Sequence, residues 1–169
     1  RLRDPQYVQK AKEVQSIAND FETGKQTAAI EEVLAVLKKN KITYDVQELE
    51  IGSAIYAQKP GDGSAREQAA SCQKVLGALA DFAKEYATKR YRSNCINWGI
   101  LPFVCKEGEL FEEGSYVYIP GIFAALADDR MIKAYIIKDG QLSETLLSLG
   151  ELTAEEKQII KAGNLINYY

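Results

Sequence analysis

Residues 59–70 are Lys59-Pro60-Gly61-Asp62-Gly63-Ser64-Ala65-Arg66-Glu67-Gln68-Ala69-Ala70, and an apolar run, Ile51 to Ala57, leads into them. A helix-like spacing of residues follows the glycines, so this order predicts a strand, a glycine-rich loop and the start of a helix. A helix N-terminus offers unpaired backbone N–H groups and a partial positive charge. Together with a serine hydroxyl and an arginine, the turn therefore predicts a site for a small anion, either a carboxylate or a phosphate.

The same residues also fit a purely structural interpretation. Ser64-x-x-Glu67 is the sequence of a capping box, in which Ser64 caps the helix and Glu67 reaches back to the backbone. The glycines would then only permit a tight turn, and Arg66 would be a solvated residue. A cation in the first turn lies against the positive end of the helix, which favours a bound anion. Both interpretations stay open at this point.

Several kinds of chemistry are excluded by the residues that the chain lacks. The glycine-rich turn has no Gly-Lys-Ser/Thr at the spacing of a nucleotide P-loop. The sequence contains no histidine, which removes the serine–histidine couple and most zinc sites. The three cysteines, Cys72, Cys95 and Cys105, form no Cys-x-x-Cys pair. We therefore expect free thiols in a reducing cytosol and no metal site within this chain.

The composition is that of an ordinary globular protein. The chain has 169 residues, of which 46% are hydrophobic and 27% charged, and its net charge is −3. This balance gives no electrostatic reason for nucleic-acid or membrane binding, and no apolar run is long enough for a membrane span. The basic cluster Lys89-Arg90-Tyr91-Arg92 is better explained as a solvated helix face or a partner contact than as an RNA site. We expect a cytoplasmic protein.

The periodicity predicts one mixed α/β domain over residues 1–169, with a helical lead-in over residues 1–40. The expected helices are 5–18 with Asp4 as N-cap, 27–39 capped by Thr27, 65–76, 88–97, and a last helix from the capping box at Thr153 to Gly163. The expected strands are 51–57, 101–104, 116–119, the hairpin 131–137 with 142–149 around Asp139-Gly140, and a weaker candidate at 42–49. Residues 79–86 fit a strand or a helix, and residues 122–126 are too short to assign.

Two motifs at a fitting interval carry a family resemblance. Gly63 to Ala69 is similar to the Gly-Ser-Ser-Arg-Glu-His-Ala signature of the aconitase superfamily. Downstream, Tyr91-Arg92-Ser93-Asn94-Cys95-Ile96-Asn97-Trp98-Gly99-Ile100-Leu101-Pro102 resembles the family stretch Arg-Ser-Asn-Leu-Ile-Asn-Phe-Gly-Ile-Leu-Pro. The resemblance is good over residues 51–103. The bacterial aconitase-like hydratase group has the turn in the form Lys-Pro-Gly-Asp-Gly-Ser-Ala-Arg-Glu-Gln-Ala-Ala, as here.

The resemblance implies a swivelling β/β/α domain that closes over a larger body carrying a [4Fe–4S] cluster. That body binds the cluster, whose iron acts on the departing hydroxyl, and a small di- or tricarboxylate lies between the two parts. The implied catalytic base is Ser64, the implied carboxylate ligand is Arg66, and the substrate-binding turn is Gly63 to Arg66. The implied reaction is hydro-lyase chemistry, the removal and re-addition of water. This chain would then be inactive without the cluster-bearing domains.

Two departures from the family signature bear on which substrate is bound. The second serine of the signature is Ala65 here, and its histidine is Gln68.

Because the chain begins at Arg1 in mid-pattern, we expect it to be an excised or processed part of a longer protein. Two alternatives are the small subunit of an isopropylmalate isomerase-type enzyme and a non-catalytic module that binds a carboxylate or RNA.

Overall fold

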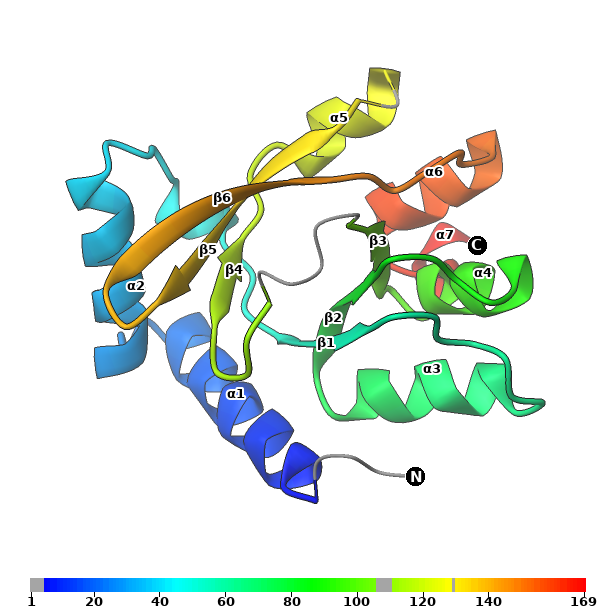
Figure 1. Ribbon diagram of the computed structural model, residues 1–169, viewed down its shortest axis with the longest axis horizontal. Helices are drawn as coiled ribbons and strands as arrows, with labels where there is room; N and C mark the ends of the chain where they lie inside the picture. Colours follow the sequence, from blue (N-terminus) through cyan, green and yellow to red (C-terminus); the bar gives the residue numbers. More distant parts are fainter. Residues whose placement is uncertain (1–4, 106–110, 129) are drawn as a thin grey trace.

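A computed structural model describes residues 5–105, 111–128 and 130–169, which form two three-stranded sheets (Figure 1). The first sheet is parallel with the order β1 (Ser53–Ala57), β2 (Ala78–Ala83), β3 (Leu101–Val104). The second is an antiparallel meander of β4 (Tyr116–Tyr118), β5 (Ile132–Lys138) and β6 (Gln141–Leu147). Reciprocal backbone hydrogen bonds between Val104 and Ser148, 2.7 and 3.0 Å long, join them. The predicted mixed α/β fold is confirmed.

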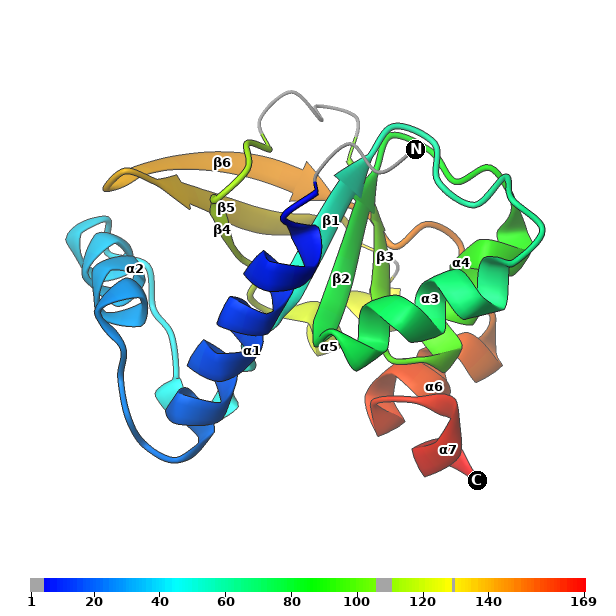
Figure 2. The ribbon, with the colours of Figure 1, turned by 90° about the horizontal axis from the view of Figure 1, so that it is seen from below.

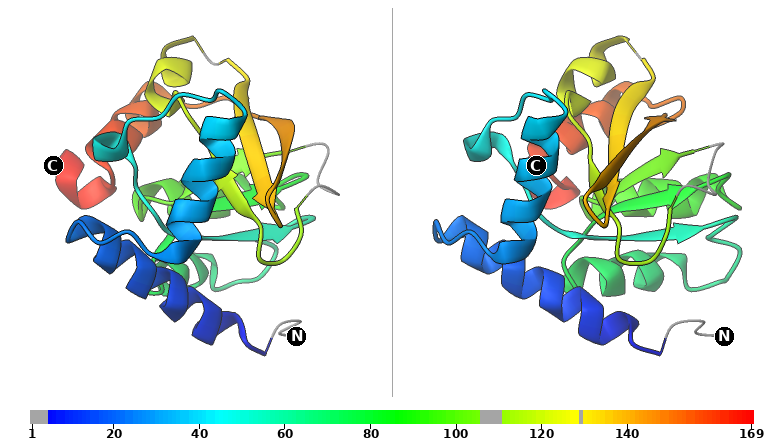
Figure 3. Two further views of the ribbon diagram at one scale, coloured as in Figure 1. Left: turned by 90° about the vertical axis from the view of Figure 1, so that its left-hand side faces the viewer. Right: turned by 60° about the vertical axis from the view of Figure 1, so that its left-hand side comes forward.

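The helices cover the outer faces of these sheets. Their bounds are α1 (Tyr7–Glu22), α2 (Ala28–Lys39), the 3₁₀ turn η1 (Val46–Glu48), α3 (Arg66–Val75), α4 (Lys89–Asn97), α5 (Ile122–Asp128), α6 (Ala154–Ala162) and α7 (Leu165–Tyr168). Figure 2 shows α1, α3 and α4 on one face of the parallel sheet. Figure 3 shows α2 lying across the β5–β6 hairpin. None of the helices in the described part of the chain combines the length and the apolar composition of a membrane span.

The alternation of side chains along β2 divides the core. Phe82 and Ala80 point to the face that meets the antiparallel sheet, where they pack in the main apolar cluster with Leu147 and other residues. Ala78, which is separated from Ala80 by a register shift in the pairing with β1, lies on the side of the helices and packs with Tyr91 and Ile100. Parallel strands need crossover connections, and here α3 and α4 supply them. Both helices therefore start from loops that leave the same edge of the sheet, the carboxyl ends of β1 and β2.

Two sequence expectations are wrong in the N-terminal third. The first helix does not end at residue 18 but continues to Glu22, and the chain turns at Gly24 with a φ of +82°. The weak strand expected at 42–49 does not form. The Asp45 side chain there accepts a hydrogen bond from the Gln47 N–H at 2.9 Å, which favours the 3₁₀ turn η1. The proposed N-cap Asp4 lies outside the described residues.

Most of the other local predictions are confirmed, although Thr27 lies at the N-cap of α2 without a side-chain hydrogen bond to the helix. Asp139 and Gly140 have φ angles of +49° and +73°, as a two-residue hairpin turn requires. Thr153 and Glu156 form the predicted capping box at the start of α6. The structure also assigns the two segments that the sequence left ambiguous: residues 78–83 form a strand and residues 122–128 form a helix. The strand that contains Pro102 lies at an edge of the parallel sheet, as its missing N–H requires.

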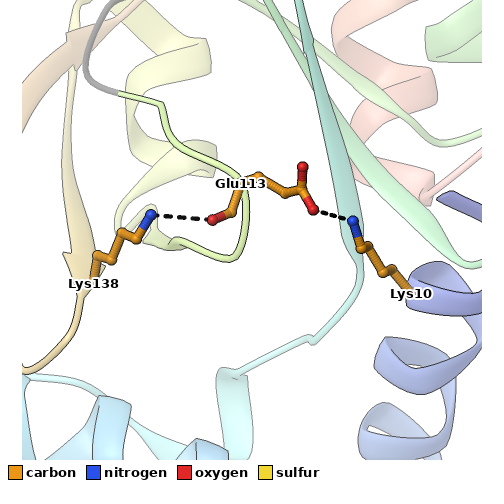
Figure 4. Close-up of polar contacts among 3 residues, drawn as sticks. All are labelled: Lys10, Glu113 and Lys138. Atoms are coloured by element: carbon orange, nitrogen blue, oxygen red, sulfur yellow. Dashed lines mark hydrogen bonds and ion pairs between the residues drawn. The ribbon is translucent and has the colours of Figure 1, made fainter. Parts of the chain in front are cut away.

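The segment before β4 connects the two halves of the molecule. Glu113 pairs with Lys10 of α1, and its backbone carbonyl accepts a hydrogen bond from Lys138 of β5 at 3.2 Å (Figure 4). Phe111 in the same segment stacks on Tyr56 and Phe82, with ring centroids 5.6 and 4.6 Å away. This segment thus contacts the parallel sheet, α1 and the hairpin.

Candidate functional site

The turn that holds Ser64 is built on the carboxyl edge of the parallel sheet. Residues 58–61 run beside residues 84–88 (Figure 2), and the amides of Glu85 and Ala87 donate to the carbonyls of Gln58 and Pro60 at 3.2 and 2.9 Å. These bonds continue the parallel pairing past the ends of β1 and β2. The loop therefore leaves the sheet in a fixed direction before it reaches α3.

The first turn of α4 holds Gly61 closely. Thr88 Oγ1 donates to the Gly61 carbonyl at 3.1 Å and accepts from the Tyr91 N–H at 3.2 Å. Gly61 has a φ of +95°, and a Cβ there would lie 2.5 Å from Cβ of Tyr91. Only glycine fits this approach without displacement of the Tyr91 side chain. The first glycine of the motif thus has a packing role.

The structure brings the predicted site residues together at the start of α3. Gly63, Ser64 and Ala65 are exposed, and Arg66 opens the helix. Arg66 is half-buried, and its Nε is buried with no hydrogen-bond partner among the residues that the structure describes. A guanidinium N–H that is withdrawn from water and unpaired can donate to an incoming anion.

The capping-box alternative for Ser64 is wrong. The N-cap of α3 is Ala65, and no side chain of that position caps the helix. The N-terminus of α3 is capped from α4 instead. With the Asn94 amide oriented to satisfy both of its ends, its oxygen accepts from the Glu67 N–H at 3.2 Å and its nitrogen donates to the Arg90 carbonyl at 3.3 Å. The Ser64 hydroxyl is therefore not used for capping.

The second motif anchors α4, which carries this cap. Arg92 donates to the Leu149 carbonyl, and Ser93 Oγ donates to Oε1 of Glu156 at 2.8 Å. The basic cluster at residues 89–92 is consequently divided, because Lys89 and Arg90 are exposed whereas Tyr91 is buried and Arg92 is bound inward. The expected solvated face is therefore limited to Lys89 and Arg90, since a helix turns neighbouring residues to different sides.

A buried carboxylate lies behind the turn, and sequence reasoning missed it. Asp81 of β2 is fully buried, and its Oδ2 accepts from the Tyr91 hydroxyl at 3.0 Å and from Cys95 Sγ at 3.5 Å. Burial raises the pKa of the Asp81 carboxyl to about 6, against the lowering effect of these two hydrogen bonds. One acidic residue within the apolar run Ala78 to Ala83 was the signal that could have revealed it.

The cysteines are free, as predicted. Cys72 is exposed, Cys95 is bound to Asp81, and Cys105 Sγ lies 3.5 Å from Thr145 Oγ1. Burial raises the pKa of the Cys95 thiol, and the Asp81 charge raises it further. Within residues 5–105, 111–128 and 130–169, no three His, Cys, Asp or Glu side chains gather as metal ligands would. These residues do not fit an iron–sulfur cluster.

Comparison with known families agrees with this geometry. Residues 6–108, more than half of the chain, match the model described as the aconitase C-terminal domain. The chain belongs to the aconitase C-terminal domain family. A search of the curated proteins found no match. The match includes α1, α2, the whole parallel sheet and both motifs.

Membership of the aconitase C-terminal domain family gives the general chemistry. The family is part of hydro-lyase enzymes, in which this domain accompanies other aconitase-type domains or a large subunit. An aconitase-type parent enzyme implies a [4Fe–4S] cluster, and the described residues of this domain offer no ligand set for one. The aconitase-type turn, by contrast, lies on the surface, where Ser64 is accessible.

Proposed function

We propose that this chain is the substrate-closing domain of an aconitase-like hydro-lyase acting on a small di- or tricarboxylate. The observation that carries the proposal is the exposed turn Gly63 to Arg66 in a chain that matches the aconitase C-terminal domain family. The turn combines one hydroxyl, one guanidinium and the N-terminus of α3. The cluster belongs to the accompanying domains, and this chain supplies Ser64 and Arg66.

Ser64 is the proposed base. Its hydroxyl is exposed immediately before α3, where the helix dipole and nearby N–H groups stabilise negative charge on oxygen. In the forward direction Ser64 Oγ takes the proton from a carbon next to a carboxylate. The electron pair left behind forms the new double bond as the hydroxyl on the neighbouring carbon departs. The proton on Ser64 Oγ is then released, so the net loss is one water molecule, and rehydration is the reverse.

Arg66 is the proposed carboxylate ligand. A guanidinium donates two parallel hydrogen bonds to a carboxylate, which fixes the orientation of the substrate. The unpaired Nε of Arg66 supports this role, because an anion would satisfy it. Charge that develops on the substrate during proton removal spreads onto the bound carboxylate and is stabilised there. Ala65 contributes only its backbone to substrate binding.

The first test replaces the proposed base in the enzyme assembled from this chain and the cluster-bearing domains. We expect Ser64→Ala to lower kcat by about 10² to 10⁴-fold, the usual contribution of a positioned base. Ser143→Ala, a matched change at an exposed position of β6, is expected to retain full turnover. Unchanged turnover of every carboxylate tested in Ser64→Ala would exclude Ser64 as the base.

The second test measures binding of citrate to the chain by calorimetry. We expect Arg66→Ala to weaken binding by roughly tenfold to a hundredfold, the loss of charge-assisted hydrogen bonds. Arg130→Ala is the matched control, because Arg130 is exposed and pairs with Asp128 near the end of α5. Binding that survives Arg66→Ala would count against the assignment of Arg66, and binding lost equally in both variants would indicate a nonspecific effect of charge.

A further inference from the structure

Asp81 is connected to the candidate site by a short chain of contacts. Its Oδ2 accepts a hydrogen bond from the Tyr91 hydroxyl at 3.0 Å, and both residues are almost completely buried, at 0% and 2% exposed. Tyr91 lies in the first turn of α4. The hydroxyl also lies 3.3 Å from Oε1 of Gln73, so α3 meets the same tyrosine.

The other end of Tyr91 contacts the turn. A Cβ built on Gly61 would lie within 2.7 Å of three carbon atoms of Tyr91, so the backbone of Gly61 is packed directly against this side chain. The Tyr91 N–H also orients Thr88, whose hydroxyl holds the Gly61 carbonyl. A displacement of Tyr91 must therefore move Gly61, which is two residues from Gly63 and three from Ser64.

A buried carboxylate at position 81 lowers the stability of the fold, so stability does not explain its presence. Its desolvation is only partly offset by two donors, and Oδ1 has no hydrogen-bond partner among the described residues. The neighbours of Asp81 on β2 are Ala80 and Phe82, and an apolar residue at 81 would avoid the desolvation. What the carboxylate adds is a fixed acceptor for one particular hydroxyl.

We infer that Asp81 is a positioning residue, which sets the place of the Ser64 turn by holding Tyr91 against Gly61. This inference rests on the proposed role of Ser64. It assigns no contact between Asp81 and the substrate, since the carboxylate acts through Tyr91.

The test uses three variants and a control. Tyr91→Phe removes only the hydroxyl and keeps the ring on Gly61. Asp81→Leu removes the hydrogen-bond acceptor, and Asp81→Asn keeps an acceptor oxygen at the same position. In the assembled enzyme we expect Tyr91→Phe and Asp81→Leu to lower kcat by about tenfold or more through misplacement of the base, with KM changed much less. Asp81→Asn should recover most of the loss. Cys95→Ala, which removes the other donor to Oδ2, should stay within about twofold of the parent enzyme.

A local readout makes the test independent of turnover. In the ¹⁵N-labelled chain, the amide signals of Gly61 and Gly63 should shift in Tyr91→Phe and Asp81→Leu and stay in place in Cys95→Ala. Should Asp81→Leu fail to fold, Tyr91→Phe gives the same answer. Unmoved glycine signals together with parental kcat in folded Tyr91→Phe would overturn the inference. If Ser64→Ala retains turnover, the proposed function fails, and the glycine signals alone then decide whether Asp81 positions the turn.

Discussion

At the scale of single residues, the buried carboxyl group of Asp81 affects how the stability of the chain depends on pH. The groups that face Asp81 come from every element around it: Tyr91 and Cys95 from α4, Tyr86 from the loop after β2, and Tyr7 from α1. All four are neutral at pH 4 to 7, and burial or the Asp81 charge raises the pKa of each. Titration in this range therefore belongs to Asp81 itself.

The pKa of Asp81 is raised from 3.8 to about 6, so the folded state favours the protonated form. Between about pH 4 and pH 6 the unfolded chain has lost this proton and the folded chain has not, so the free energy of unfolding decreases as the pH rises. Relative to Asp81→Asn, the parent chain should lose stability on the order of 2 kcal/mol from pH 4 to pH 7. Urea unfolding at several pH values measures this. Parallel curves for the two proteins would contradict the prediction.

The sequence predicted the exposed site residues better than the residues that hold them. Ser64 and Arg66 could be found because a loop with two glycines before a helix is visible in a single stretch. Asn94 and Thr88 could not be connected to that stretch, because their partners, Glu67 and Gly61, are 27 residues away along the chain. Such contacts follow from the crossover geometry of the parallel sheet and leave no local pattern.

At the scale of elements, α3 depends on α4 for its N-terminal cap. The other capped helices use their own preceding residue, as Thr88, Thr153 and Asn164 do for α4, α6 and α7. The cap of α3 comes from the neighbouring helix, so it forms only once α3 and α4 pack. This arrangement leaves the residue before α3, and the serine next to it, free of a capping role.

Loss of this cap should destabilise the chain measurably. We expect Asn94→Ala to lower the free energy of unfolding by about 1 kcal/mol, the common value for a lost N-cap. Asn19→Ala, an exposed change within α1, is the control and should cause no loss. Equal stability of Asn94→Ala and the parent chain in urea unfolding would show that the Glu67 N–H has another acceptor.

Element assignment failed where polar side chains compete with the backbone. The alternation over 42–49 indicated a strand, but Asp45 bonds to the Gln47 amide and turns the chain into η1. The ambiguity over 79–86 had a different cause, since a short apolar run fits a buried strand or a helix equally. Pairing with β1 and β3 on both sides decided it in favour of β2.

At the scale of the whole molecule, the segment before β4 makes two kinds of contact with the rest of the chain. One is aromatic, because Phe111 stacks on Tyr56 of β1 and Phe82 of β2. The other is ionic, because Glu113 pairs with Lys10 of α1. Exposed ion pairs contribute little to stability, since water screens them and the side chains lose freedom, whereas buried aromatic area contributes in proportion to its size.

These contributions predict different effects on the free energy of unfolding for two substitutions in this segment. Phe111→Ala should lower the free energy of unfolding by about 1–3 kcal/mol, because it removes a half-buried ring that stacks on two other rings. Glu113→Gln should leave stability almost unchanged, because the Glu113 side chain is 68% exposed. Urea unfolding at low and high salt measures both, and the effect of Phe111→Ala should persist at high salt. If Glu113→Gln destabilised the chain as much as Phe111→Ala, and only at low salt, the connection between the segment before β4 and α1 would be electrostatic.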